Sequence, residues 1–128
     1  MRLFSRQVVL GDGDYRIVPA TVVIAGSRIR EVVEGPLEGE VGLDLGDKLL
    51  SPAFVDPHTH VALHALRGIG FAQTQGNVVE DLFYRFEQLL SAEDIAAFAR
   101  MGAYDRLLSG VGLVWDHYFH GEAIARAL

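Results

Sequence analysis

The sequence predicts an α/β protein in which a β-rich segment, residues 1–48, precedes the start of a parallel α/β unit, residues 49–128. Three observations support this. The first segment alternates short β-forming runs with glycine-containing turns. The second reads as strand, loop, helix, helix, strand and helix. All five histidines lie at or beyond position 58, so the residues best suited to chemistry gather in the second segment.

The first segment reads as a series of antiparallel hairpins. Turn residues at 11–14 and 26–27 separate short apolar runs of strand length. The strands are expected at residues 3–10, 15–18, 21–24 and 28–33, and residues 41–45 and 48–50 add two more. Gly11 and Gly13 are read as a turn rather than a phosphate-binding loop, because no helix follows them.

The second segment begins with an apolar run, residues 49–55, that leads into His58-Thr59-His60. Side chains alternate along a strand, so His58 and His60 are expected on one face and Thr59 on the other. Two neutral imidazoles so placed can share one metal ion. Asp56 has the same parity, so it either supports these histidines or is a structural carboxylate.

Two helices and a second strand are expected next. Apolar side chains at residues 79–90 fall on one helical face, and Ser91 with Asp94 forms a capping pair for a helix that Gly110 ends. Residues 111–115 are uncharged and typical of a strand buried on both faces. This strand delivers Asp116 and His117 at its C-terminal end, and residues 122–128 begin another helix.

Composition excludes several classes of partner. The net charge of −6 and the lack of a Lys/Arg run argue against nucleic acid, while a small neutral or cationic substrate is compatible. No uncharged stretch approaches the ~18 residues that span a bilayer. With no cysteine, a metal must be held by His and carboxylates. A cytoplasmic protein without membrane contact is therefore expected.

These residues together resemble a known family. The strand from Ser51 to His60, the step Leu66-Arg67-Gly68, and Ser109-Gly110-Val111 leading to Asp116-His117 are similar to the amidohydrolase superfamily. The resemblance is to its branch of cyclic deaminases and triazine hydrolases, guanine deaminase-like and chlorohydrolase-like. The chain departs from that pattern at Ala53, where glycine is usual, and at residues 110–113, where Gly-x-Thr-Thr is usual.

The resemblance implies a (β/α)8 barrel preceded by a small β-sandwich-type domain. It assigns His58 and His60 as ligands of a divalent metal, zinc or alternatively iron. A water on such an ion has a pKa of roughly 7 and can attack a ring carbon at neutral pH. The implied function is hydrolysis of carbon–nitrogen bonds, such as deamination of a nucleobase-like or triazine-like ring.

The barrel is expected to be incomplete in this chain. At roughly 30 residues per βα unit, the residues from Leu50 onward supply two or three of the eight units. The remaining metal ligands and the catalytic acid and base are therefore expected beyond residue 128. Either missing sequence or a second chain would complete the barrel, and a homo-oligomer is compatible with this.

Several residues and functions keep two interpretations. His117 either touches substrate or orients the metal ligands, and His64 either faces substrate or is a solvated or capping histidine. A hydantoinase or dihydroorotase type of cyclic amidase also fits the stretch Asp56 to His60. The last alternative is a truncated fragment without catalytic activity.

Overall fold

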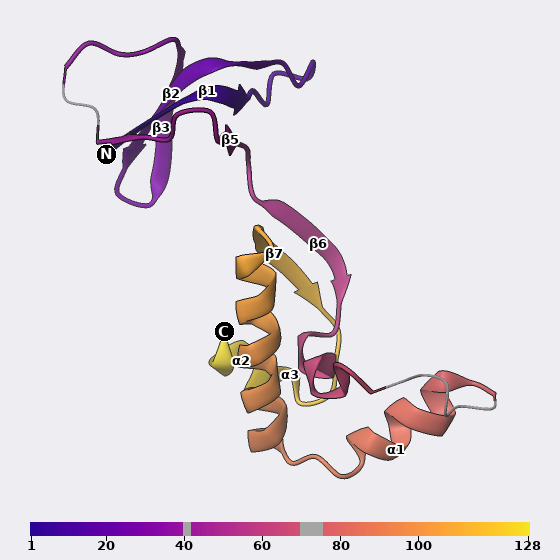
Figure 1. Cartoon of the computed structure of the whole chain (residues 1–128). Coiled ribbons are helices and arrows are strands. Elements are labelled where there is room, and N and C mark those ends of the chain that lie inside the picture. Colours follow the sequence, from indigo (N-terminus) through magenta and orange to yellow (C-terminus); the bar gives the residue numbers. More distant parts are fainter. Residues whose placement is uncertain (40–41, 70–75) are drawn as a thin grey trace. The chain divides into compact units, whose positions relative to one another are not determined.

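The computed structural model describes residues 1–39, 42–69 and 76–128, and it divides into two compact units, Met1–Pro52 and Ala53–Leu128 (Figure 1). The first unit is a small β-sheet. The second combines a pair of parallel strands with helices. The α/β class predicted from the sequence is therefore confirmed.

The sheet of the first unit has the order β3-β2-β1-β4, and β5 also pairs with β1. Neighbours among β1, β2 and β3 run antiparallel, whereas β4 and β5 run parallel to β1. The strands are β1 (Arg2–Val9), β2 (Ile17–Ala25), β3 (Arg28–Glu34), β4 (Leu43–Asp44) and β5 (Leu49–Leu50). Residue 41, the first of the strand expected at 41–45, lies outside the described residues.

The two strands predicted at 15–18 and 21–24 are one continuous strand, β2, which passes through Pro19. Proline has no amide hydrogen, so it normally interrupts a sheet. Here Pro19 lies opposite an irregularity in the β1–β2 register, between Ser5 and Val8, where the missing donor breaks no regular ladder. The Pro19 carbonyl still accepts a hydrogen bond from the Gly35 amide, at 2.7 Å.

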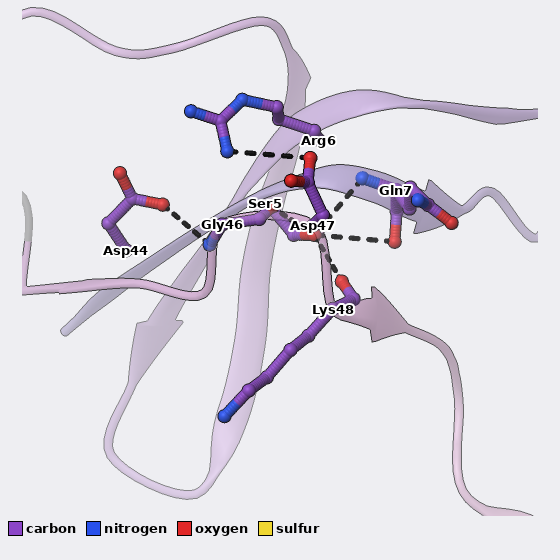
Figure 2. Close-up of polar contacts among 7 residues, drawn as sticks. All are labelled: Ser5, Arg6, Gln7, Asp44, Gly46, Asp47 and Lys48. Carbon is purple, nitrogen blue, oxygen red and sulfur yellow. Dashed lines mark hydrogen bonds and ion pairs between the residues drawn. The ribbon is translucent and has the colours of Figure 1, made fainter.

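Ser5, at the same irregularity, joins β1 to the segment between β4 and β5 (Figure 2). Its side chain is fully buried, and its hydroxyl lies within hydrogen-bonding distance of the Gly46 and Lys48 carbonyls. The same oxygen accepts from the Gln7 amide at 3.0 Å. A buried hydroxyl needs such partners, so Ser5 stabilises this crossing of the chain.

The second unit is built on β6 and β7, which pair in parallel as the sequence predicts. Among the described residues, short helical segments and a long helix lie between these strands, and a short helix follows β7 (Figure 1). The bounds are β6 (Phe54–Thr59), η1 (Val61–Leu66), η3 (Val79–Phe83), α1 (Tyr84–Glu87), α2 (Ala92–Leu108), β7 (Val111–Asp116) and α3 (Gly121–Ala127).

The helix expected over residues 79–90 differs from the prediction. A π-helical turn, η3, comes first, and only Tyr84–Glu87 is α-helical. The wider turn shifts the phase of the side chains, so the apolar face read from the sequence does not continue to its end. Leu89 is accordingly 79% exposed.

Helix α2 begins and packs as the sequence indicates. Ser91 and Asp94 form a full capping box, in which each side chain accepts a hydrogen bond from the other's backbone amide. Gly102 allows η1 to approach the helix, because a Cβ there would lie 2.0 Å from the Val61 carbonyl oxygen. The core of this unit consists of Val61, Ala62, Ile95, Ala99 and Ile124.

The expectation that residues 111–115 are buried on both faces is wrong for the described part of the chain. Leu113 is 62% exposed and Trp115 is 75% exposed. Phe54 and Val55 on β6 are exposed as well. Within the described residues β7 pairs only with β6, so much of the apolar surface of this two-stranded sheet stays uncovered.

None of the helices formed by the described residues is both long and apolar enough to cross a membrane.

Candidate metal centre

His58 and His60 lie at the C-terminal end of β6. His58 is within the strand and exposed, and His60 follows its last residue. Their rings meet edge to face with centroids 5.2 Å apart. The intervening Thr59 is only 3% exposed. The structure therefore brings the two imidazoles together, as the spacing predicts.

The orientation of the His60 ring is set by a backbone carbonyl. His60 Nδ1 lies 2.6 Å from the His117 carbonyl oxygen. A carbonyl can only accept, so Nδ1 carries the hydrogen and donates it. The lone pair of the neutral ring is then on Nε2, which is the arrangement in which metal-binding histidines are commonly held.

The end of β7 holds the end of β6 through two further contacts. Asp116 Oδ2 accepts from the Val61 amide at 2.7 Å, and the His117 amide donates to the Thr59 carbonyl at 3.2 Å. The His117 ring centroid is 6.4 Å from that of His60. His117 thus lies beside the histidine pair. Asp116 holds the start of η1, which directly follows His60.

The strict alternation assumed for β6 breaks at Pro57. Asp56 Oδ2 and Thr59 Oγ1 both accept hydrogen bonds from Arg106 of α2, each at 3.1 Å. Perfect alternation would place these two side chains on opposite faces. The β6–β7 register shifts between Asp56 and Thr59, which accounts for the change. The parity argument for Asp56 is therefore corrected: its carboxylate lies toward α2, with Thr59.

His64 contacts helix α2. Its Nδ1 is 3.3 Å from Asp105 Oδ2, and Arg67 pairs with the same carboxylate. The His64 side chain is 19% exposed. This contact joins η1 to α2.

A cavity of about 400 Å³ adjoins His60 and His117. Its polar lining includes Glu87 and Tyr118, and its apolar lining is Leu63, Val79, Phe83, Tyr84 and Phe119. Glu87 Oε2 and the Tyr118 hydroxyl are buried and close enough to interact with each other, but neither has a well-aligned hydrogen-bond partner among the described residues. Buried polar groups without partners are uncommon and mark sites where a ligand or water completes the bonding.

The sequence analysis did not predict Glu87 or Tyr118 as site residues. One signal for Glu87 was available, because it lies four residues after Phe83, on the face that the sequence predicts to be apolar. Tyr118 follows the Asp116-His117 step directly. Burial raises the pKa of Tyr118, and a side-chain hydrogen bond with Glu87 and the charges of Glu87 and Asp116 raise it further. Tyr118 is therefore neutral near pH 7 and able to donate a hydrogen bond.

In the described part of the chain, no three His, Asp or Glu side chains are grouped so that they alone could hold a metal ion. The two histidines nevertheless fit one. Imidazole nitrogens suit zinc and iron, and the His60 ring is already held in a tautomer whose Nε2 carries the lone pair that a metal can use.

Comparison with solved structures identifies the fold. The chain matches an atrazine chlorohydrolase from Arthrobacter aurescens complexed with zinc, with a TM-score of 0.74 and 21% identity over 98% of this chain and 32% of that one. An adenosine deaminase from Xanthomonas campestris with bound zinc gives a TM-score of 0.82 and 16% identity over 98% of this chain and 30% of that one. The chain thus shares its fold with about a third of each of these two zinc-containing enzymes.

The sequence relatives are named as deaminases. A 5-methylthioadenosine/S-adenosylhomocysteine deaminase of Haloarcula marismortui is 36% identical over 73% of this chain and 22% of its own length. The Pyrococcus abyssi protein of that name is 31% identical over 94% of this chain, and a 5'-deoxyadenosine deaminase of Methanobrevibacter smithii is 27% identical over 98%. No family model matches the chain.

The chain spans only 22% to 29% of the length of these three relatives. The resemblance to the N-terminal portion of the amidohydrolase superfamily, in its deaminase and triazine hydrolase branch, is confirmed.

Proposed function

We propose that the protein carrying this chain is a metal-dependent amidohydrolase that deaminates an adenosine derivative. The relatives are named as deaminases of 5-methylthioadenosine, S-adenosylhomocysteine and 5'-deoxyadenosine, which share an adenine ring with an exocyclic amino group. Deamination adds water at the ring carbon that carries this amino group and releases ammonia. The substrates so named are small molecules, in keeping with the cavity beside the histidines.

The observation that carries the proposal is the histidine pair at the end of β6, with His60 Nδ1 donating to the His117 carbonyl. His58 and His60 would hold one divalent ion, most simply zinc, since two solved structures of this fold contain it. When bound, such an ion supplies a water acidic enough to act as a nucleophile near neutral pH.

The relatives, which are longer than this chain, support a proposal for its place in the whole protein. Residues 1–48, together with β5 of the same sheet, would form part of a small β-sandwich-type domain. The rest of the segment 49–128, from Ala53 onward, would form the first two βα units of the barrel. The exposed apolar side chains on β6 and β7 would then be covered by further barrel strands. The remaining metal ligands and the catalytic acid and base would come from those strands.

The cavity beside the histidine pair would bind the substrate. Its apolar wall, with Phe83, Tyr84 and Phe119, suits an aromatic ring. Glu87 would accept a hydrogen bond from a hydroxyl or amino hydrogen of the substrate, and Tyr118 would donate one. In this role each buried group would gain a well-aligned hydrogen-bond partner, which the described residues do not supply.

The cyclic amidase alternative, of hydantoinase or dihydroorotase type, is weaker because the relatives in hand are deaminases. The two reactions have different products. A deaminase releases ammonia from an aminated ring, whereas a cyclic amidase opens a ring without releasing ammonia.

The test is a deaminase assay on the purified protein loaded with zinc. Methylthioadenosine, 5'-deoxyadenosine and adenosine would be offered, and ammonia release and the change in purine absorbance followed. His58→Ala should abolish turnover. The matched control is His120→Asn, because His120 is exposed and asparagine tolerates its left-handed backbone (φ 53°). Absence of ammonia with all three nucleosides, together with opening of a hydantoin or dihydroorotate ring, would favour the cyclic amidase instead.

A further inference from the structure

Arg106, near the C-terminal end of α2, contacts residues on both sides of His58. Its Nε donates to Asp56 Oδ2 and its Nη2 donates to Thr59 Oγ1, both at 3.1 Å. Asp56 lies two residues before His58, and Thr59 directly follows it. One guanidinium group therefore links the stretch of β6 that bears His58 to the long helix behind it.

This stretch lacks regular support from its neighbouring strand. Pro57 has no amide hydrogen to donate, and the β6–β7 pairing is irregular between Asp56 and Thr59. The backbone around His58 is thus not fixed by a continuous ladder of hydrogen bonds. Side-chain contacts must therefore hold this part of the backbone in place.

Asp56 and Thr59, the two partners of Arg106, can both pass its influence on to the backbone at His58. Thr59 is 3% exposed, so its hydroxyl has few alternatives to the guanidinium. The second oxygen of Asp56 lies 3.4 Å from the His58 amide nitrogen, which donates to it. The guanidinium is planar and rigid, so the two donors hold Asp56 and Thr59 in a fixed relation.

We propose that Arg106 is a positioning residue for the metal centre: by joining Asp56 to Thr59, it fixes the direction in which His58 presents its ring beside His60. This inference rests on the proposed function, since it assumes that His58 and His60 bind a metal ion. In this role Arg106 acts through Asp56 and Thr59 and not by binding the ion.

The test measures metal affinity, not turnover. The purified metal-free protein is titrated with Zn²⁺ against a chromophoric chelator and with Co²⁺, whose visible spectrum reports the geometry around the ion. Arg106→Met, which removes the donors but keeps a long side chain, should weaken Zn²⁺ binding about 10- to 100-fold and alter the Co²⁺ spectrum. Arg106→Lys should also weaken binding, because one ammonium cannot reproduce the fork that contacts both partners.

Two further variants separate positioning from general stability. Arg100→Met is the matched control, since Arg100 is exposed on the same helix, and it should change affinity by no more than about twofold. Thr59→Val removes one partner of the guanidinium and should weaken binding by itself. The double variant Arg106→Met/Thr59→Val should bind no more weakly than Arg106→Met, because both changes break the same link.

The outcomes are distinguishable. If the folded Arg106→Met and Arg106→Lys proteins bind Zn²⁺ like the wild type and give its Co²⁺ spectrum, the positioning role is wrong while the metal site stands. If Arg106→Met does not fold, Arg106→Lys and Thr59→Val decide the question by the same criteria. If the wild-type protein binds no metal, or binds it equally well after His58→Ala, the proposed function fails and the role of Arg106 fails with it.

Discussion

The imidazole Nδ1 of His60 lies 2.6 Å from the backbone carbonyl oxygen of His117. The first residue after β7 therefore orients the first residue after β6, and it does so through its main chain. The two parallel strands of the second unit are thus joined at the ends where barrel enzymes of this fold place their active sites.

Because the main chain makes this contact, His117→Ala should leave metal affinity within about threefold of the wild type. Loss of a side chain that hydrogen-bonds a metal ligand typically lowers affinity about 10- to 100-fold. If the His117 ring touches substrate, the same variant will lower kcat/KM. Measuring Zn²⁺ affinity and kcat/KM on one preparation separates the two roles that the sequence leaves open for His117. A loss of affinity of 10-fold or more would mean that its side chain supports the metal ligands.

Replacing Glu87 with glutamine should lower kcat/KM about 10- to 100-fold, because a charged acceptor buried beside the cavity is replaced by a neutral amide. The fold should be unaffected. Glu93→Gln serves as the control, since Glu93 is exposed in the first turn of α2. If kcat/KM of Glu87→Gln equals that of the wild type for every nucleoside that the enzyme deaminates, the substrate does not bind at Glu87.

Gly102→Ala should destabilise the protein by about 1–3 kcal/mol, because its Cβ would lie 2.0 Å from the Val61 carbonyl oxygen and η1 would have to move away from α2. Chemical denaturation measures this change. Gly121→Ala is the matched control, since a Cβ at Gly121 meets nothing within 4 Å, and it should be neutral or slightly stabilising. Equal stabilities for the two variants would contradict the close packing of η1 on α2.

Acid should weaken the capping of α2. Hydrogen bonds from the Ser91 side chain and backbone hold the pKa of Asp94 below its ordinary value of 3.8. A carboxyl group with a lowered folded-state pKa stabilises the fold above its unfolded pKa, and this contribution is lost as the pH falls through the folded value. Between pH 5 and pH 2, the metal-free wild type should therefore lose more unfolding free energy than Asp94→Asn does. Parallel curves for the two proteins would rule out this contribution.

The sequence predicted well those features that depend on short-range patterns. The parallel strands around His58-Thr59-His60 and Asp116-His117, the capping pair Ser91 and Asp94, and the approach of the two histidine rings all follow from alternation, spacing or local hydrogen bonding. Each involves residues close in sequence or rules that hold regardless of tertiary context.

Features that depend on packing between distant segments were not predictable. The side of β6 on which Asp56 lies accompanies a register shift between Asp56 and Thr59 and a contact with a guanidinium 50 residues away. The π-helical turn of η3 changes the phase of an apolar pattern that is compatible with a regular helix. The exposure of Leu113 and Trp115 depends on which other segments pack against β7. The local sequence of a strand does not specify its tertiary neighbours.

The central claim is that His58 and His60 hold a catalytic metal ion, and elemental analysis of the purified protein tests it most directly. The account predicts about one zinc or iron per chain in the wild type and a nearly complete loss in the folded His58→Ala and His60→Ala variants. Equal metal content in the wild type and in both variants, or no metal in an active wild-type deaminase, would contradict it.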